Sequence, residues 1–256
     1  MRHQNRTAVV LGGGRDVGRA TVLQLVAEQA DVIVADISAD DVTEVCAAGG
    51  PSVRGHVLDV ADPDALAALA REVEETWPVL NVLVTYYNSV DRAPLEQLGL
   101  EGWEQTVREN LTAPFVASMA FLPLLKRAPG AAAVVHFTSV DGLFGNPTIP
   151  AYSATKGGVV ALIHVQAAEF ATHGIRVNGV ARAATAEVVA ELHIPQVDID
   201  RLRIATPLGR IGSAAETAAV AAFLASDEAS YVTGVVIPVD GGRTAITPGT
   251  LKPAPG

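Results

Sequence analysis

Short apolar runs alternate with longer stretches of helical periodicity along most of the chain. The apolar runs predict β-strands at Thr7–Leu11, Asp31–Asp36, Ser52–Leu58, Val82–Thr85, Ala132–Thr138, Arg176–Ala181 and Val235–Val239. The stretches between them predict helices that begin near Arg15, Ala39, Pro63, Trp103, Tyr152 and Ala214. This alternation is typical of a parallel sheet with helices on both faces. We therefore predict an α/β fold, a doubly wound three-layer sandwich around a seven-stranded parallel sheet.

No internal repeat or mid-chain linker interrupts this rhythm, so we expect one domain over residues 1–256. The tail from about residue 243 is rich in Pro and Gly and predicts an irregular arm. Residues 157–171 are the most apolar helix candidate, but polar residues such as Gln166 and Glu169 interrupt them. We expect a buried or interface helix there and not a membrane span. Because so little of its surface is polar, we also expect a homo-oligomer.

The amino-acid composition limits which kinds of molecule we expect the protein to bind. The chain is 49% hydrophobic, enough for a large core, and carries a net charge of −10. Its 18 Lys and Arg residues do not gather into a basic run, which argues against nucleic acid and anionic membrane as partners. Cys46 is the single cysteine, and the first six residues lack the apolar run of a signal peptide. We therefore expect a cytoplasmic protein without disulfides.

Two chemical classes find little support in the residue patterns. The six histidines are scattered without the spacing of metal ligands, so no metal site is predicted. Ser139 lies outside a G-x-S-x-G motif, and no histidine is placed to act as its base, which argues against a serine hydrolase.

The candidate catalytic stretch runs from Ser139 to Lys156. Tyr152 and Lys156 are four residues apart, so on a helix they lie one turn apart on the same face. An ammonium beside a phenol lowers the pKa of the phenol towards the pH at which a general acid or base works. Ser139 follows an apolar run and precedes glycines, so we expect its hydroxyl in the same cavity. The pair also occurs by chance on solvated helix faces, so it does not establish a site alone.

A glycine-rich turn that contains Gly12 and Gly18 joins the first predicted strand to the first helix. Glycines at such a turn let the backbone approach a pyrophosphate, whose charge the helix N-terminus favours. Asp36 ends the second predicted strand, where a carboxylate can accept hydrogen bonds from an adenosine ribose and repel a 2′-phosphate. Together these features favour NAD over NADP as a cofactor.

The Ser139 and Y-x-x-x-K pattern resembles the catalytic signature of the short-chain dehydrogenases/reductases, and the resemblance covers Thr7 to about Gly242. It implies a Rossmann-like fold and a homotetramer. It also implies that Tyr152 transfers a proton, that Lys156 lowers the pKa of Tyr152 and holds the nicotinamide ribose, and that Ser139 orients a carbonyl oxygen. Asn110 falls where the family's fourth catalytic residue interrupts a long helix and holds a water in a proton relay.

The same resemblance assigns the cofactor and substrate segments. It implies cofactor contacts from Gly12, Arg15, Gly18, Asp36, Asp59, Val60, Asn88, Tyr152, Lys156 and Thr185. Thr185 stands at the position of the family's carboxamide-binding threonine. Asp59 resembles the adenine-contacting aspartate, although a helix cap explains it equally well. Arg15 resembles a basic residue of relatives that use NADP, but we expect Asp36 to dominate. Residues 186–206 resemble the substrate lid, and their mixed character predicts a modest apolar pocket.

The glycine-rich turn departs from the family pattern T-G-x-x-x-G-x-G. Leu11 stands at the position of its threonine and Asp16 at the position of its second glycine. A carboxylate at residue 16 would approach the anionic pyrophosphate unless it turns outward or pairs with Arg15 or Arg19.

Two further cofactor segments depart as well. The family's N-N-A-G is T-Y-Y-N here, and Tyr86 and Tyr87 either fill the space of the cofactor or both point away and pack against helices. Arg182 and Ala183 replace the Pro-Gly pair that resembles the nicotinamide contact.

Three readings of function follow. The first is an NAD-dependent oxidoreductase that acts on a secondary alcohol or a ketone, with Asn110, Ser139, Tyr152 and Lys156 as its catalytic residues. The second is a non-redox lyase, isomerase or cyclase that uses the same acid and base groups without nicotinamide, because the cofactor segments are altered. The third is a non-enzymatic subunit, against which the intact catalytic set argues. None of these patterns identifies the substrate.

Overall fold

The computed structural model describes residues 1–246, which contain a seven-stranded sheet in the order β3-β2-β1-β4-β5-β6-β7. Every neighbouring pair of strands is parallel. The strands are β1 (Thr7–Leu11), β2 (Asp31–Asp36), β3 (Val53–Val57), β4 (Val82–Thr85), β5 (Ala132–Ser139), β6 (Ile175–Arg182) and β7 (Val236–Val239). The strand order reverses between β1 and β4, as in a doubly wound sheet. The predicted fold class is confirmed.

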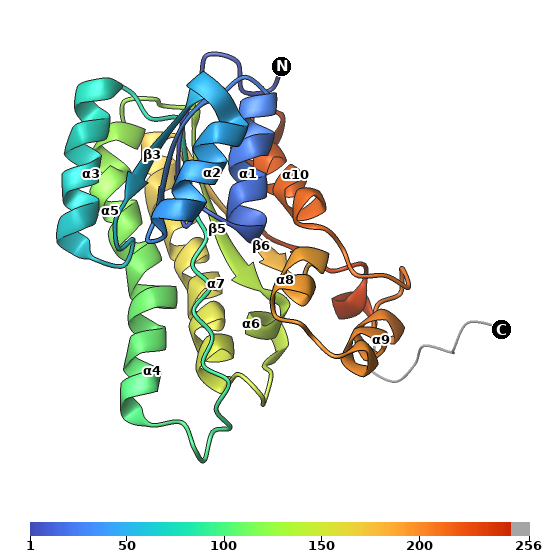
Figure 1. The fold of residues 1–256 in the computed structure, drawn as a ribbon. Coiled ribbons are helices and arrows are strands. Elements are labelled where there is room, and N and C mark those ends of the chain that lie inside the picture. The colour runs from blue at the N-terminus through green and yellow to red at the C-terminus, as the bar shows by residue number, and fades with distance from the viewer. Residues whose placement is uncertain (247–256) are drawn as a thin grey trace.

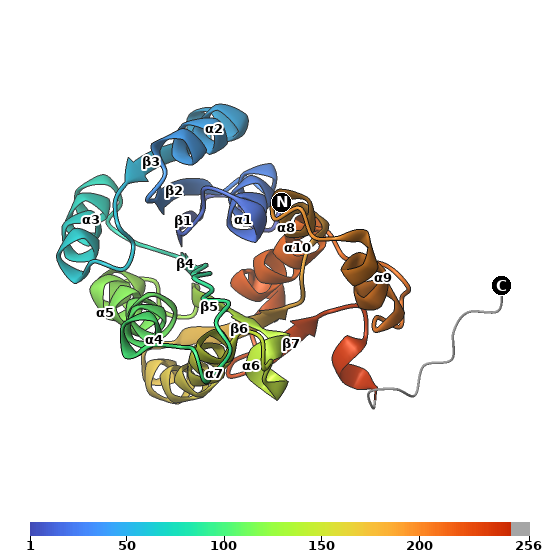
Figure 2. The ribbon, with the colours of Figure 1, turned by 60° about the horizontal axis from the view of Figure 1, so that its bottom comes forward.

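Helices cover both faces of the sheet (Figure 1). One face carries α1, α2 and α10, and the other carries α3, α5 and α7 (Figure 2). These helices are α1 (Asp16–Ala27), α2 (Ala39–Gly49), α3 (Pro63–Thr76), α5 (Ala113–Leu125), α7 (Pro150–Phe170) and α10 (Ala214–Ala225), and the shorter α4 (Leu100–Val107) precedes α5. Two expected helix starts, near Trp103 and Tyr152, lie slightly inside the observed α4 and α7.

Side-chain alternation along the strands divides the core into two layers. Val9 and Leu11 of β1 belong to the hydrophobic cluster that includes α3, α5 and α7, whereas Ala8 and Val10 belong to the cluster with α1 and α10. Successive side chains of a strand point to opposite faces, so both faces of β1 are buried. This is why the strands appear in the sequence as continuous apolar runs.

Polar caps fix where several helices begin. Ser38 accepts a hydrogen bond from the Asp41 amide at the start of α2, and Asp62 accepts one from the Asp64 amide at the start of α3. The α10 helix begins with a capping box made by Ser213 and Glu216. These caps satisfy amide groups that have no partner within the helix.

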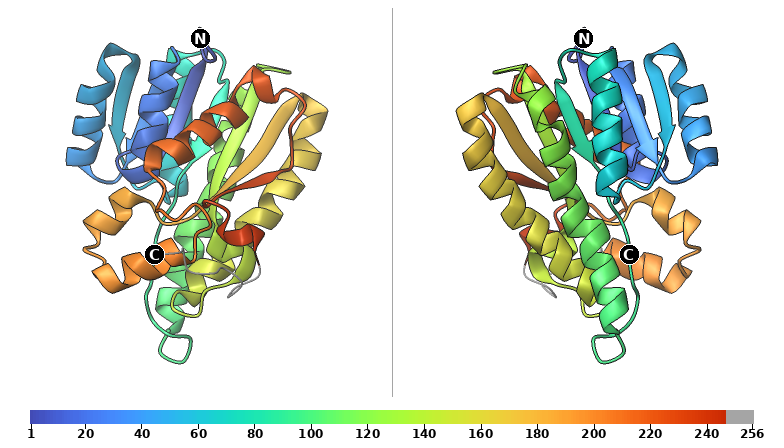
Figure 3. Two further views of the ribbon diagram at one scale, coloured as in Figure 1. Left: turned by 90° about the vertical axis from the view of Figure 1, so that its right-hand side faces the viewer. Right: turned by 90° about the vertical axis from the view of Figure 1, so that its left-hand side faces the viewer.

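The carboxyl ends of the strands face the lower side of Figure 1, where the short helices gather. They are α6 (Val140–Phe144), α8 (Ala186–Glu191) and α9 (Gln196–Ile204). Figure 3 shows α8 and α9 projecting below this edge, so the expected lid segment forms two helices. The expected irregular arm instead begins with a 3-10 turn at Arg243–Ala245, and its remainder, 247–256, lies outside the described residues. None of the helices in residues 1–246 is both long and apolar enough to cross a membrane.

Candidate active site

Tyr152 and Lys156 lie one turn apart on α7, and Ser139 is the last residue of β5. All three side chains are buried. Ser139 caps α6, since its hydroxyl oxygen accepts a hydrogen bond of 3.1 Å from the Asp141 amide. The strand end and the helix therefore bring the three predicted catalytic groups to the carboxyl edge of the sheet.

The Tyr152 hydroxyl shares a hydrogen-bond acceptor with an arginine. It donates to Asn88 Oδ1 at 3.1 Å, and Arg182 Nη2 donates to the same oxygen at 2.8 Å. Because a guanidinium group only donates, it fixes the oxygen of the Asn88 amide towards the site. Arg182 is buried and lies over the Tyr86 ring, 5.5 Å from its centroid.

Lys156 lies over the Tyr152 ring and is hydrogen-bonded to backbone oxygens. Its Nζ donates to the carbonyl oxygens of Tyr87 and Phe137 and lies 5.5 Å from the centroid of the Tyr152 ring. Burial, and next the Arg182 charge, lower the pKa of Lys156 to about 7. The Lys156 side chain is therefore only partly protonated, and only partly charged, at neutral pH.

The pKa of Tyr152 is raised above its usual value. Burial is the main cause, because the anionic phenolate loses its hydration. The Arg182 charge opposes burial most strongly, and the Ser139 hydroxyl also lowers the pKa. Asp141 and Asp16 raise it further. A net raised pKa keeps the phenol protonated near neutrality, ready to donate.

Asn110 lies in a π-helical turn, Arg108–Thr112, that separates α4 from α5. Its side chain is fully buried, accepts a hydrogen bond from the Ser89 amide at 3.0 Å and donates to the Ser89 carbonyl at 2.6 Å. A turn of this kind often marks a functional position. Asn110 thus holds the segment next to Asn88, and its link to Tyr152 runs through that segment.

Close backbone packing explains two of the predicted glycines. Gly12 has φ of +76°, and a Cβ atom there would lie 1.9 Å from the carbonyl oxygen of Tyr86. A Cβ atom on Gly18 would lie 2.0 Å from the carbonyl oxygen of Gly12. Only glycine lets the turn and α1 approach each other this closely.

Asp36 lies at the floor of the cleft behind this turn. Its carboxylate accepts hydrogen bonds of 2.8 Å from the amides of Gly14 and Ile37. Arg15 lies at the rim, where it forms ion pairs with Asp41 at 3.1 Å and with Glu191 of α8 at 3.0 Å. The basic side chain is thus engaged by two carboxylates.

A cavity of about 500 Å³ occupies this cleft. Its lining includes Gly12, Arg15, Asp16, Asp36, Asp59, Val60, Tyr86, Tyr87 and Asn88, but not Tyr152, Ser139 or Arg182. Asp59 accepts a hydrogen bond from the Ala61 amide at 2.9 Å and lies 3.4 Å from Arg108. Six of the predicted cofactor residues therefore line one cavity, whereas Gly18, Tyr152, Lys156 and Thr185 do not. Asn88 lines the cavity and accepts the hydrogen bond of Tyr152.

Asp16 neither turns outward nor pairs with Arg15 or Arg19, the two alternatives that the sequence left open, because its side chain is buried. Its carboxylate accepts hydrogen bonds from the hydroxyls of Tyr86 and Thr185, the latter at 2.8 Å, and lies 3.9 Å from Arg182 Nη1. Asp16 has φ of +46°, a left-handed conformation that suits the glycine of the family pattern. This conformation directs the carboxylate across the cleft, where partners distant in sequence meet it.

The two adjacent tyrosines behave differently, so neither of the joint predictions for them holds. Tyr87 packs into the core beside α3 and α5, and its hydroxyl donates to the Val60 carbonyl at 2.9 Å. Tyr86 packs edge-on against Phe137, with ring centroids 5.4 Å apart, and reaches Asp16 with its hydroxyl. Tyr86 is thus the tyrosine that contributes a polar group to the cleft.

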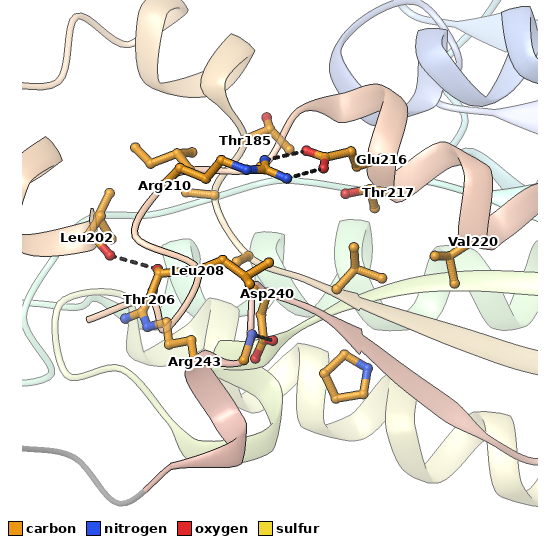
Figure 4. Close-up of a pocket in the computed structure, with 18 of the residues that line it drawn as sticks. Thr185, Leu202, Thr206, Leu208, Arg210, Glu216, Thr217, Val220, Asp240 and Arg243 are labelled. Atoms are coloured by element: carbon orange, nitrogen blue, oxygen red, sulfur yellow. Dashed lines mark hydrogen bonds and ion pairs between the residues drawn. The ribbon is translucent and has the colours of Figure 1, made fainter. Parts of the chain in front are cut away.

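Two further cavities lie under the α8 and α9 segment. One, of about 310 Å³, is lined in part by the ion pair between Arg210 and Glu216 (Figure 4). Hydrogen bonds from Arg210 lower the pKa of Glu216 to about 2. The other, of about 510 Å³, is mostly apolar and is lined by Val140, the residue that follows Ser139 in the chain, but not by Ser139 itself. Its lining includes Val140, Asp141, Phe144, Arg201, Ile204, Arg243 and Ile246.

Comparison with known proteins places this geometry in a family. A family model described as enoyl-(acyl carrier protein) reductase matches residues 13–244. The 3-oxoacyl-(acyl-carrier-protein) reductase FabG of Thermotoga maritima is 34% identical over 246 residues, which cover 94% of this chain and 99% of that protein. The chain belongs to the short-chain dehydrogenase/reductase family.

Other relatives of this family differ in their described activities. The cis-4-hydroxycyclohexanecarboxylate dehydrogenase of Sinomonas cyclohexanicum is 35% identical over 246 residues, covering 94% of this chain and 97% of that protein. A crystal structure described as ribose-5-phosphate isomerase from Brucella melitensis 16M is similar with a TM-score of 0.89 and 34% identity, covering 95% of this chain and 93% of that chain.

Within this short-chain dehydrogenase/reductase fold, the sequence patterns did not show how the altered residues connect. Asp16, Tyr86 and Arg182 form one polar cluster with Asn88 and Thr185. The only signal for it was that each of the first three replaces a residue of the family pattern. Such replacements, found together, indicate a shared environment.

Proposed function

We propose that this protein is an NAD-dependent oxidoreductase that acts on a secondary alcohol or a ketone. The observation that carries the proposal is the grouping of Tyr152, Ser139 and Lys156 at the carboxyl edge of the sheet, beside a cleft with Asp36 at its floor. Relatives described as a 3-oxoacyl reductase and a hydroxycyclohexanecarboxylate dehydrogenase act on groups of this kind, which supports the same class of reaction here.

The chain's own residues supply the proton chemistry. Tyr152 gives its proton to the carbonyl oxygen in reduction and takes it back in alcohol oxidation. Ser139, close enough to lower the pKa of Tyr152, would hold the same oxygen by a hydrogen bond. Lys156 and Arg182 supply positive charge around the phenol. NAD, when bound, would accept or deliver the hydride.

The residues around the cavity fit the adenosine half of the cofactor. Gly12 and Gly18 allow the close backbone approach that a pyrophosphate site needs. Asp36 Oδ2 accepts one backbone hydrogen bond, from the Gly14 amide, and retains a lone pair for a ribose hydroxyl, whereas Oδ1 accepts from the Ile37 and Ser38 amides. Asp59 and Val60 provide the wall for an adenine ring.

The nicotinamide half fits less well. Asn88, which lines the cavity, is hydrogen-bonded to both the Arg182 guanidinium and the Tyr152 hydroxyl, and Asp16 adds a carboxylate near the N-terminus of α1. Access to Tyr152 would require Arg182 to give up its hydrogen bond to Asn88. A hydrogen bond to a charged group contributes about 1.5–3 kcal/mol, which corresponds to a loss of about ten- to a hundredfold in affinity. We therefore expect weak NAD binding.

Preference for NAD over NADP rests on Asp36 and Arg15. A 2′-phosphate would meet the Asp36 carboxylate at the cleft floor, and like charges repel. Arg15 could compensate, but Asp41 and Glu191 already neutralise it.

We propose the apolar cavity lined by Val140 and Asp141 of α6 as the substrate pocket, with α9 as its lid. Phe144 and Ile204 line it and are largely exposed, so an apolar substrate body would cover them.

We also propose that the protein forms a homo-oligomer through α5 and α7. Phe115 and Met119 of α5 and Val165 of α7 are each about half exposed. A self-complementary pairing of this face with a second copy would cover them. Val165→Asp should lower the oligomeric mass in light scattering without loss of helical circular dichroism, and an unchanged mass would count against this interface.

The proposal is tested by turnover of the purified protein with NAD and a panel of cyclic and linear secondary alcohols. Tyr152→Phe keeps the ring but removes the transferable proton, so we expect a loss of about a hundred- to ten-thousandfold. Tyr231→Phe, at a fully exposed position, is the matched control and should retain full turnover. Full turnover in Tyr152→Phe would refute the assignment.

A non-redox acid and base enzyme is the second candidate. The observation that favours it is that Tyr152 lies outside the cavity lining, with its hydroxyl and Arg182 both bound to Asn88, since such a reaction needs no nicotinamide beside the phenol. The neighbour described as an isomerase is consistent with this reading. Turnover that depends on Tyr152 but not on added dinucleotide would select it over the first.

A further inference from the structure

Arg182 is the charged group most closely tied to the Tyr152 hydroxyl. Both donate to one oxygen of Asn88, at 2.8 and 3.1 Å. The distance between Arg182 Nη2 and the Tyr152 hydroxyl oxygen therefore cannot exceed the combined length of these two hydrogen bonds. The Tyr86 ring and the Asp16 carboxylate hold the guanidinium from other sides, so its position is fixed.

Lys156, which the family resemblance predicts to lower the pKa of Tyr152, is not joined to the Tyr152 hydroxyl in the way that Arg182 is. Its Nζ is engaged by two backbone carbonyl oxygens, and it lies over the ring of Tyr152. With its pKa lowered to about 7 by burial, it loses its charge across the neutral range. Burial also lowers the pKa of Arg182, but its acidic neighbours, chiefly Tyr86 and Tyr152, more than offset this and the pKa is raised. Arg182 is thus the permanent cation of the site.

We propose that Arg182 is a positioning residue for Tyr152. Arg182 fixes the Asn88 oxygen to which the Tyr152 hydroxyl donates its hydrogen bond. The permanent charge of Arg182 also stabilises the Tyr152 phenolate when the proton leaves. This inference rests on the proposed role of Tyr152 as acid and base, and it holds for redox and non-redox chemistry alike.

Several elements bring titratable or charged groups to Tyr152. They are Asp16 at the start of α1, Tyr86 after β4, Asp141 in α6, Lys156 in α7 and Arg182 at the end of β6. The two carboxylates oppose ionisation of the phenol, and Arg182 counters them. An opposite charge within about 4–6 Å typically shifts a pKa by about one to three pH units.

Direct titration of the phenol tests the inference without any cofactor or substrate. The ultraviolet difference spectrum of tyrosine ionisation is recorded against pH, and subtraction of the Tyr152→Phe protein isolates Tyr152 among the four tyrosines. In Arg182→Gln we expect Tyr152 to ionise about one to three pH units higher, or not before alkaline unfolding. Arg182→Lys retains the charge and should recover most of the difference. Arg203→Gln, which removes an exposed arginine of α9, should change nothing.

Lys156→Met provides a second route if Arg182→Gln does not fold. With Arg182 intact, we expect the Tyr152 titration to move by less than about half a pH unit in this variant, because the shift caused by Arg182 is larger. An unmoved Tyr152 in folded Arg182→Gln, or a larger shift in Lys156→Met, would overturn the inference. Failure of the proposed function is distinct, because it would appear as full turnover in Tyr152→Phe.

Discussion

Replacement of Asp16 by glycine should strengthen NAD binding and relieve a strained backbone at once. Two unit charges about 4–6 Å apart attract or repel by about 3–4 kcal/mol at an effective dielectric constant near 20. Arg182, 3.9 Å from the Asp16 carboxylate, cancels part of the repulsion that a pyrophosphate would meet. We expect a net gain of about 1–2 kcal/mol, or about five- to thirtyfold in affinity.

The matched variant Asp16→Asn separates charge from strain. Asparagine removes the charge but keeps a side chain at φ of +46°, whereas glycine also removes the left-handed penalty of about 1–2 kcal/mol. Calorimetric titration should therefore show stronger NAD binding in both variants, while thermal unfolding should favour glycine over asparagine. Asp64→Asn, in the exposed first turn of α3, should leave binding unchanged. If neither variant at position 16 bound NAD more tightly, the carboxylate would not be the barrier that we infer.

The remaining predictions concern cofactor choice, folding and pH. Asp36→Ala should raise the affinity for NADP relative to NAD by about tenfold in calorimetry, and an unchanged ratio would rule out the charge argument. Gly12→Ala should lower the melting temperature markedly, because its Cβ would lie 1.9 Å from the Tyr86 carbonyl oxygen, whereas Gly99→Ala, with open space around it, should not. The pKa of Lys156 falls from about 10.4 in the unfolded chain to about 7, so the unfolded state binds more protons between these values and stability should rise with pH across that window. In Lys156→Met this rise should be smaller, and an identical pH dependence of unfolding would contradict it.

The central sheet could be predicted because buried parallel strands appear as continuous apolar runs. The expected bounds of β1, β2 and β4 match those of the structure. The placement of Tyr152 and Lys156 on one helix face could also be predicted, because helical spacing alone determines it. Local periodicity therefore carries both the fold and the core of the candidate site.

Partners that are distant in sequence could not be predicted. Arg182 lies 94 residues from Asn88, and no local pattern links them. Asp16 was expected to turn outward or to pair with Arg15 or Arg19. Its left-handed backbone, with φ of +46°, instead accompanies contacts to Tyr86, Thr185 and Arg182, all distant in sequence. Treating Tyr86 and Tyr87 alike was a physical error, because successive side chains of an extended segment point to opposite sides. Tyr87→Ala would thus open a hole in the core as well as enlarge the cavity that Tyr87 lines.

Calorimetric titration of the purified protein with NAD and NADP tests the central claim most directly. The account predicts weak but measurable binding of NAD, weaker binding of NADP because of Asp36, and turnover that requires both NAD and Tyr152. Absence of binding by either dinucleotide at millimolar concentration, in a protein whose turnover still requires Tyr152, would contradict the redox assignment and leave the cofactor-free enzyme in its place.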